Sequence, residues 1–259
     1  MDRILIIGAG AMGSAIARGL ARTGVATGIY NRSAQRLKAL DDVEGLQRFS
    51  DLGKAVEEMM PDLVIVALPA EASRRTIESL SKISGPGKAC AATLSPMISL
   101  ADMQAMIPGR NVARIMPNIG ITKGESMTFI CAAGPSGEKA GEKIAALFRT
   151  MGDAVLIPEH EMGAVTALAS CGTAYALRYI RACMQAGVQM GLEAPDACRY
   201  TLQTLRGACA LLADGNSHPE AEIDKVCTPG GLTIRGVNAL DRGGFSAATI
   251  GAILESFKS

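Results

Sequence analysis

The chain has 259 residues, 48% of them hydrophobic, which is enough to bury the core of one large domain or of two modest ones. Its 26 Lys and Arg residues nearly balance 25 Asp and Glu residues, for a net charge of +1. This balance gives no general attraction to nucleic acid or to an anionic membrane surface, so we expect neither as a partner.

Cysteine and histidine usage narrows the chemistry. The seven cysteines form no C-x-x-C pair and mostly lie among apolar residues, as buried thiols do in a reduced compartment. We therefore expect a cytoplasmic protein, and the first apolar run leads into a glycine turn rather than a secretory cleavage site. The only histidines, His160 and His218, lie in separate segments. We expect no metal site and no histidine-based triad.

The first thirteen residues combine a short apolar strand with the pattern G-x-G-x-x-G. The strand Ile4–Ile7 leads into the glycines, and a helical stretch Ser14–Arg22 follows directly. The first glycine permits a tight turn, the second lets a pyrophosphate approach the backbone, and the third lets the helix pack closely on the strand. A glycine turn can also be purely structural, but the intact strand, turn and helix favour dinucleotide binding. The candidate cofactor-binding residues here are Gly8, Gly10, Ala11, Met12 and Gly13.

The end of the second predicted strand, Ala26–Tyr30, bears on which dinucleotide binds. An NAD-selective site usually carries an acidic residue there, which accepts a hydrogen bond from the adenosine ribose. This chain has Asn31, Arg32 and Ser33 instead. A guanidinium and two neutral polar groups suit a 2′-phosphate, which a carboxylate would repel. The pattern favours NADPH over NADH, and the alternative is an ordinary polar loop containing one arginine.

Apolar runs alternate with helical stretches through the first 157 residues. This rhythm predicts a doubly wound, mostly parallel α/β sheet. Ligands of such sheets bind beyond the carboxyl ends of the strands, so Leu68, Pro69 and Asn118 join the candidate cofactor-binding residues, with Leu94-Ser95 at the same edge. The further predicted strands are Leu63–Ala67, Ala89–Thr93, Val112–Ile115, Met127–Ala132 and Ala154–Ile157, and the further helices are Ala34–Leu40, Leu52–Met59, Ala72–Lys82, Leu100–Ile107 and Ser136–Met151.

Beyond Pro158 the strand signals stop. Glu161–Gly191 reads as one long helix rich in small residues, followed by helices over Pro195–Leu212 and Ser246–Phe257. Polar residues interrupt the apolar part of the first helix, so it fits a protein interior better than a membrane. We therefore predict two domains, residues 1–158 and an all-helical domain of residues 159–259. Its apolar faces indicate a homodimer.

A second glycine-rich loop lies near the C-terminus, over Cys227–Ile234. Its two glycines and a proline lead into a predicted helix, Thr233–Leu240. Such turns expose consecutive N–H groups at a positive helix end and so form a nest for a small anion such as a carboxylate. Thr233 would cap the helix or donate to the ligand. The plainer interpretation is a connecting turn with a threonine cap.

Several motifs in order give the chain a family resemblance. The segment Thr228–Thr233 is similar to S-P-G-G-x-T, Arg114–Asn118 to R-x-M-P-N, Gly124–Thr128 to G-x-G-M-T, and Gly172–Tyr175 to G-P-A-Y. With the N-terminal glycine turn, these motifs resemble the pyrroline-5-carboxylate reductases along the whole chain.

The resemblance implies a Rossmann-like domain that binds NADPH and an all-α C-terminal dimerisation domain, whose dimers assemble further, as in a decamer. It also implies that a cyclic imino acid lies between the nicotinamide and the loop, at the subunit interface. Thr228, Gly230 and Gly231 would bind its carboxylate, and Thr233, the candidate catalytic residue, would hydrogen-bond the ring nitrogen. Hydride transfer to the imine carbon would convert 1-pyrroline-5-carboxylate to L-proline, with orientation supplying most of the catalysis.

Three departures from the family pattern leave alternatives open. Ala67–Ala70 lacks the lysine of V-K-P-Q, Ile119-Gly120 replaces T-P, and Cys171 and Thr173 change S-G-S-G-P-A-Y. They favour, as a second hypothesis, a different cyclic imine such as a piperideine or pyrroline-2-carboxylate. A non-catalytic NADP(H)-binding protein is a third. A β-hydroxyacid dehydrogenase would carry a catalytic lysine on its long helix, and residues 162–192 contain no lysine.

Overall fold

The computed structural model describes residues 1–81 and 89–257. These residues form two compact units, Met1–Ser170 and Cys171–Ser259, the last of which is described as far as Phe257. The division comes later in the chain than the predicted boundary at residues 158 and 159. The reason is local packing: Met162 is buried in an apolar cluster of the first unit, so the segment that follows Pro158 stays with the sheet. The functional boundary at residue 158 stays a prediction.

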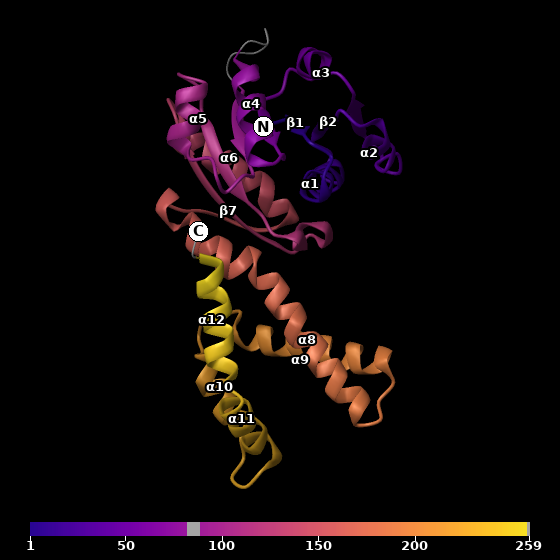
Figure 1. Cartoon of the computed structure of the whole chain (residues 1–259), viewed down its shortest axis with the longest axis vertical. Helices are drawn as coiled ribbons and strands as arrows, with labels where there is room; N and C mark the ends of the chain where they lie inside the picture. Colours follow the sequence, from indigo (N-terminus) through magenta and orange to yellow (C-terminus); the bar gives the residue numbers. More distant parts are fainter. Residues whose placement is uncertain (82–88, 258–259) are drawn as a thin grey trace. The chain divides into compact units, whose positions relative to one another are not determined.

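The first unit is built on one eight-stranded sheet with the order β3-β2-β1-β4-β5-β6-β7-β8 (Figure 1). Every neighbouring pair is parallel except β6 and β7, which are antiparallel. This order reverses direction between β1 and β4, as in the predicted doubly wound fold. The strands are β1 (Arg3–Ile7), β2 (Ala26–Tyr30), β3 (Leu46–Phe49), β4 (Leu63–Val66), β5 (Cys90–Thr93), β6 (Val112–Met116), β7 (Ser126–Ala133) and β8 (Gly152–Leu156).

Helices cover both faces of this sheet, and each face has its own apolar cluster. Strand β1 shows the division, because Ile4 and Ile6 belong to one cluster while Leu5 and Ile7 belong to the other. Successive side chains of a strand point to opposite faces, so a continuous apolar run marks a strand buried on both sides. The helices of this unit are α1 (Ala11–Ala21), α2 (Ala34–Lys38), α3 (Leu52–Met59), α4 (Ala70–Leu80), α5 (Leu100–Met106), α6 (Gly137–Phe148) and α7 (Met162–Val165).

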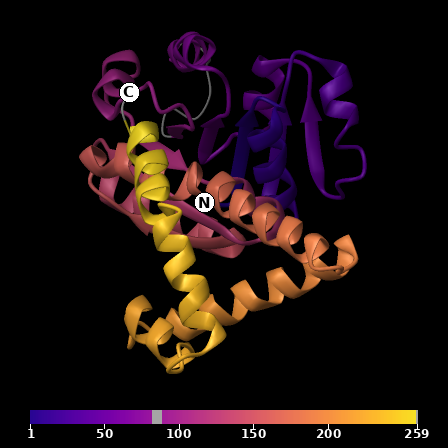
Figure 2. The same cartoon turned by 60° about the horizontal axis from the view of Figure 1, so that its bottom comes forward.

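The second unit is all-helical, as expected. Its longest helices, α8 and α9, pack against each other, and Tyr175 and Tyr179 of α8 contact α12 through a hydrogen bond to the Ala252 carbonyl (3.2 Å) and an edge contact with Phe245. Figure 2 shows α8 and α9 in salmon to orange and α12 in yellow. Among the described residues of this unit, only Gly187 and Ala197 are fully buried. The helices are α8 (Gly172–Gln189), α9 (Ala194–Leu212), α10 (Pro219–Val226), α11 (Leu232–Arg242) and α12 (Phe245–Phe257).

Three features differ from the sequence-based expectations. The single helix expected over Glu161–Gly191 is wrong: a 3₁₀ turn, the short α7 and a π-helical turn over Thr166–Ser170 precede α8. The Thr166 hydroxyl donates to the Met162 carbonyl (2.6 Å), a bond that competes with regular helix geometry. Strand β3 and helix α10 were not predicted. The predicted end of helix Ala72–Lys82 lies outside the described residues.

No described helix combines the length and the apolar character that crossing a membrane requires.

Candidate functional site

The glycine turn between β1 and α1 has the geometry that the motif predicts. Gly8 has φ +113°, and a Cβ there would lie 2.5 Å from the Ala67 carbonyl oxygen of the neighbouring strand end. A Cβ on Gly13 would overlap the Gly8 carbonyl oxygen. Only glycine allows the chain to turn this tightly and the helix to approach this closely.

Gly10 serves a different purpose, since a Cβ built there meets no atom within 4 Å. Gly10 is the N-terminal cap of α1 and provides no side-chain hydrogen bond. The backbone N–H groups of Ala11 and Met12 therefore have no partner among the described residues, and they lie at the positive end of an eleven-residue helix. The turn fits the pyrophosphate of a dinucleotide, whose oxygens would accept these hydrogen bonds.

Asn31 supports this turn from the end of β2. Its side chain is buried, accepts a hydrogen bond from the Ala9 N–H (3.2 Å) and donates one to the Ser33 carbonyl (3.2 Å). The amide is thus engaged in holding the two loops together rather than presented to solvent. Arg32 and Ser33 are exposed, and neither side chain has a partner among the described residues. Of the three residues predicted at this position, these two have groups available for a 2′-phosphate.

The loop after β4 closes over the glycine turn. A Cβ on Gly8 would lie 2.8 Å from Cδ2 of Leu68, so this side chain lies directly above the turn. The buried Ser73 hydroxyl donates to the Leu68 carbonyl (2.8 Å), and Pro69 caps α4. The structure therefore places Leu68 against the glycine turn, and binding of the cofactor by Leu68 and Pro69 stays a prediction.

Asn118 follows β6 at the same edge of the sheet. Its side chain accepts a hydrogen bond from the Gly120 N–H (2.9 Å) and begins the 3₁₀ helix Ile119–Lys123. Its amide nitrogen lies 3.5 Å from the Ala169 carbonyl, and its backbone N–H donates to Ser126 (3.2 Å). Asn118 therefore fixes the course of this loop, and its role toward the cofactor stays a prediction.

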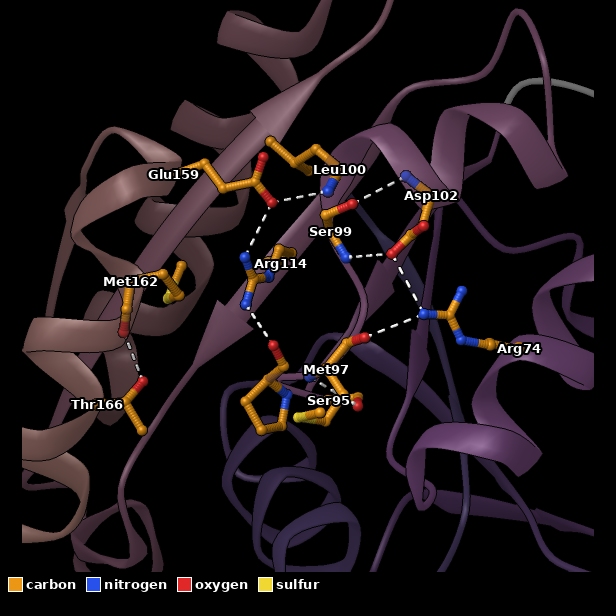
Figure 3. Close-up of polar contacts among 11 residues, drawn as sticks. Arg74, Ser95, Met97, Ser99, Leu100, Asp102, Arg114, Glu159, Met162 and Thr166 are labelled. Carbon is orange, nitrogen blue, oxygen red and sulfur yellow. Dashed lines mark hydrogen bonds and ion pairs between the residues drawn. The ribbon is translucent and has the colours of Figure 1, made fainter. Parts of the chain in front are cut away.

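A polar network beside this edge was not predicted from the sequence (Figure 3). Arg114 of β6 donates to Glu159 (2.9 Å) and to the Pro96 carbonyl (2.9 Å). Pro96 and Met97 belong to the loop that follows β5. On the other side of this loop, Arg74 of α4 donates to the Met97 carbonyl (3.1 Å) and to Asp102 (3.3 Å). The motif Arg114–Asn118 is the only sequence signal that points to this network, because its other members are scattered along the chain.

The second glycine-rich loop forms a turn that leads into α11. The Gly231 N–H donates to the Thr228 carbonyl (2.9 Å), Gly230 has φ +70°, and a Cβ on Gly231 would overlap the Thr228 hydroxyl. Gly231, and not Thr233, caps the helix, so the Thr233 side chain is exposed in the first turn. The Gly231 N–H is engaged within the turn, whereas the N–H groups of Gly230 and Thr233 have no partner among the described residues.

The cysteines near the sheet are poor nucleophiles. Burial raises the pKa of the Cys90 thiol to about 12 and, with the nearby Glu159 carboxylate, that of Cys131 to about 11. Both thiols are therefore protonated at neutral pH and are inert packing groups. No disulfide joins any of the seven cysteines, and no cluster of metal-ligating side chains occurs within residues 1–81 and 89–257.

A glycine turn at the switch point of a doubly wound sheet, followed by a helical unit, is typical of NAD(P)-dependent oxidoreductases. The family model "NADP oxidoreductase coenzyme F420-dependent" matches residues 3–89, and "Pyrroline-5-carboxylate reductase dimerisation" matches residues 159–259. The "Pyrroline-5-carboxylate reductase 2" of Dictyostelium discoideum is 34% identical over 98% of this chain and 90% of its own. The chain belongs to the pyrroline-5-carboxylate reductase family.

Solved structures agree in fold. A pyrroline-5-carboxylate reductase from Streptococcus pyogenes matches with a TM-score of 0.85 and 27% identity, over 98% of this chain and 96% of that one. A Plasmodium falciparum pyrroline carboxylate reductase with NADP bound also has a TM-score of 0.85, at 21% identity over 99% of this chain and 96% of that one. The predicted fold class and the prediction of an oxidoreductase acting on C=N bonds are confirmed. The C-terminal helical domain is a family oligomerisation domain.

Proposed function

We propose that this protein reduces 1-pyrroline-5-carboxylate to L-proline with NADPH. The observation that carries the proposal is the turn Thr228–Gly231, which ends at the N-terminus of α11 with the Gly230 and Thr233 amides unpaired among the described residues. Such a nest suits the single carboxylate of a cyclic imino acid. The whole-length similarity to a relative named for this activity supports the same substrate.

In this mechanism the protein binds and orients the two reactants. When bound, the reduced nicotinamide supplies the hydride for the imine carbon. The N–H groups of Ala11 and Met12 hold the pyrophosphate, while Leu68 and Pro69 cover the turn and Asn118 shapes the edge beside it. In the second loop, the Gly230 and Thr233 amides hold the substrate carboxylate, and the rigid turn at Thr228 and Gly231 keeps them aligned. The Thr233 hydroxyl donates a hydrogen bond to the ring nitrogen, and the proton that this nitrogen gains in the product amine comes from this hydroxyl, which water reprotonates, or from water directly.

The preference for NADPH over NADH rests on the end of β2. Arg32 and Ser33 are exposed there, their side chains have no partner among the described residues, and residues 31–33 include no carboxylate to repel a 2′-phosphate. A guanidinium binds phosphate with charge-assisted, bidentate hydrogen bonds. Asn31 contributes by fixing the loop that carries these two residues, and NADH remains the weaker cofactor.

Assembly as a homodimer, with dimers joined into a larger ring such as a decamer, completes the proposal. The support comes from the helical unit, in which only Gly187 and Ala197 are buried among the described residues. Small helical units of this kind need a partner to cover such faces.

The test is steady-state oxidation of NADPH with 1-pyrroline-5-carboxylate, run beside two six-membered piperideine carboxylates and pyrroline-2-carboxylate. We expect the highest kcat/KM with 1-pyrroline-5-carboxylate. A higher value with another ring would overturn the substrate assignment and make Leu68, Ile119, Gly120, Cys171 and Thr173 the first positions to examine for specificity. Bound NADPH without turnover on any imine would make the protein a non-catalytic relative.

A further inference from the structure

The loop that follows β5 is held from both sides by arginines, although it carries no part of the glycine motif. Arg114 reaches the Pro96 carbonyl and Arg74 the adjacent Met97 carbonyl, at 2.9 and 3.1 Å. Within the loop, the Met97 N–H donates to Ser95 (3.3 Å). Two consecutive carbonyl groups are therefore fixed by side chains from two different elements, α4 and β6 (Figure 3).

Glu159 ties this arrangement to two further segments. One carboxylate oxygen accepts from Arg114 (2.9 Å) and from the Leu100 N–H at the first turn of α5 (2.7 Å). The Arg114 side chain is only 12% exposed and that of Glu159 32% exposed, so water weakens their ion pair less than it weakens a surface pair. Arg114 Nε is buried without a partner among the described residues. Burying a guanidinium with an unpaired N–H group costs free energy. That Arg114 occupies this position despite the cost points to a role for its side chain.

The topology says which part of the cofactor this loop faces. In a doubly wound sheet, each mononucleotide half of a dinucleotide lies over the carboxyl ends of one half of the strands. The adenosine half lies on the side of β1, β2 and β3, where Arg32 and Ser33 follow β2. The nicotinamide half then lies on the side of β4, β5 and β6, whose carboxyl ends lead into Leu68, Ser95 and Asn118.

We propose that Arg114 and Glu159 are positioning residues for the nicotinamide half of the cofactor. They act through the loop Leu94–Met97, whose backbone they fix, and they do not themselves touch the reacting atoms. The proposed role is to fix the position of the nicotinamide ring, which donates the hydride. It therefore does not depend on which imine the protein reduces. A loosened loop would let the ring move away from the reactive distance, and a displacement of about 1 Å costs a large factor in rate.

The experiment compares binding of the adenosine half with use of the whole cofactor. The variants are Arg114→Lys, which keeps the charge but loses the two-branched guanidinium, and Glu159→Gln, which keeps an acceptor for Leu100. Arg3→Lys is the matched control, because Arg3 pairs with Asp62 in the same unit but at the amino ends of β1 and β4, away from the loop after β5. The readouts are affinity for 2′,5′-ADP, affinity for NADPH, kcat, and the primary isotope effect with NADPH deuterated at the transferred position.

We expect Arg114→Lys and Glu159→Gln to bind 2′,5′-ADP like the parent protein, whereas NADPH affinity weakens, kcat falls about tenfold and the isotope effect rises. Arg3→Lys should change none of these quantities. Equal losses of 2′,5′-ADP and NADPH affinity would reveal a general structural role and overturn the proposal, as would variants that match the parent protein in every readout. The two affinities need no imine, so they test the proposal even where the proposed substrate fails. In that case, weaker NADPH binding with unchanged 2′,5′-ADP binding supports it, and unchanged binding of both overturns it.

Discussion

The two units of this chain differ in how they are stabilised. The unit Met1–Ser170 buries an apolar cluster on each face of its sheet, with fully enclosed side chains such as Ile16, Leu20 and Phe148. In the unit Cys171–Ser259, only Gly187 and Ala197 are fully buried among the described residues. The first unit therefore has a complete core, whereas the second leaves many large apolar side chains exposed.

This difference separates the tasks of the two units. A unit with its own core can keep a phosphate-binding turn rigid without a partner, and rigidity is what hydrogen bonds to a cofactor require. The helical unit matches a family dimerisation domain and exposes Leu177, Val188, Leu211, Ile250 and Leu254, so we expect association to cover apolar side chains of this kind. Changes in the first unit should therefore affect cofactor binding, and changes in the second should affect assembly and substrate use.

The largest effect should come from Gly13→Ala. The new methyl group overlaps the Gly8 carbonyl oxygen, so α1 must move away from the turn. We expect a loss of about 3 kcal/mol in the free energy of unfolding, together with loss of NADPH binding. Chemical denaturation and fluorescence titration with NADPH would measure the two quantities.

Gly10→Ala is the matched control for that substitution. Its methyl group meets no protein atom, and the backbone at Gly10 (φ −81°, ψ −174°) suits alanine. The free energy of unfolding should change by less than about 1 kcal/mol, while NADPH affinity still falls about tenfold, because the methyl group occupies the space of the pyrophosphate. Tight NADPH binding by Gly10→Ala would contradict the assignment of this turn.

The second-largest effect should be weaker subunit association, caused by Leu177→Glu in α8 or Ile250→Glu in α12. Both side chains are more than half exposed in the single chain, at 59% and 58%. Association would bury the new carboxylate without a partner, so we expect the subunit dissociation constant to rise at least about 100-fold. Sedimentation velocity at several concentrations measures it.

Met60→Glu is the control for assembly, since Met60 is 50% exposed but belongs to the first unit. We expect it to leave the sedimentation coefficient unchanged. If Leu177→Glu and Ile250→Glu assemble as the parent protein does, the apolar faces of the second unit are not what holds the subunits together.

Thr233→Ala should separate substrate use from cofactor binding. Loss of the hydroxyl removes one hydrogen bond to the ring nitrogen, so we expect kcat/KM for the imine to fall about 100-fold while NADPH affinity stays the same. Thr233→Ser keeps the hydroxyl and should retain most of the activity. Unchanged turnover in Thr233→Ala would rule out the role assigned to this residue.

Arg32→Asp should change cofactor preference within the first unit. A carboxylate in place of the guanidinium repels the 2′-phosphate, so the ratio of NADPH to NADH affinity should fall about 30-fold. Arg22→Asp makes the same charge change at the C-terminal end of α1, the end away from the glycine turn. It should leave the ratio of the two affinities unaltered. Equal losses for both cofactors in Arg32→Asp would remove the case for phosphate recognition there.

Sequence patterns predicted the first unit well because its signals are local. The strand, glycine turn and helix are consecutive in the sequence, and strands buried on both faces are continuous apolar runs. Strand β3 escaped prediction because Gln47 and Arg48 are exposed at the edge of the sheet and interrupt its apolar pattern. The π-helical turn at Thr166 escaped because it contains no proline or glycine.

The candidate site could be predicted only where it lies within one segment. The loop Thr228–Thr233 and the glycine turn are continuous in sequence, so their backbone chemistry could be inferred. The network of Arg74, Arg114 and Glu159 depends on residues from three distant segments that meet only in the folded sheet. The engagement of Asn31 with the Ala9 amide likewise needs the packing of β1 against β2.

The smallest effect should be the acid sensitivity of Asp102, which completes the capping box at the start of α5 with the N-cap residue Ser99. Hydrogen bonds from Ser99, first from its backbone, and then from Arg74 hold the pKa of Asp102 below its usual value. The unfolded state therefore binds the proton more tightly. The stabilisation is fully present above the unfolded pKa of about 3.9 and is lost as the pH falls through the folded value. Denaturation of the parent protein and of Asp102→Asn between pH 6 and pH 3 should show their difference in unfolding free energy shrinking with acidity.

In the second unit, hydrogen bonds from Lys225, and then from Ser217, lower the pKa of Glu222 in the same direction, so Glu222→Gln should show the same trend there. A difference that is constant with pH would mean that these carboxylates act through shape alone.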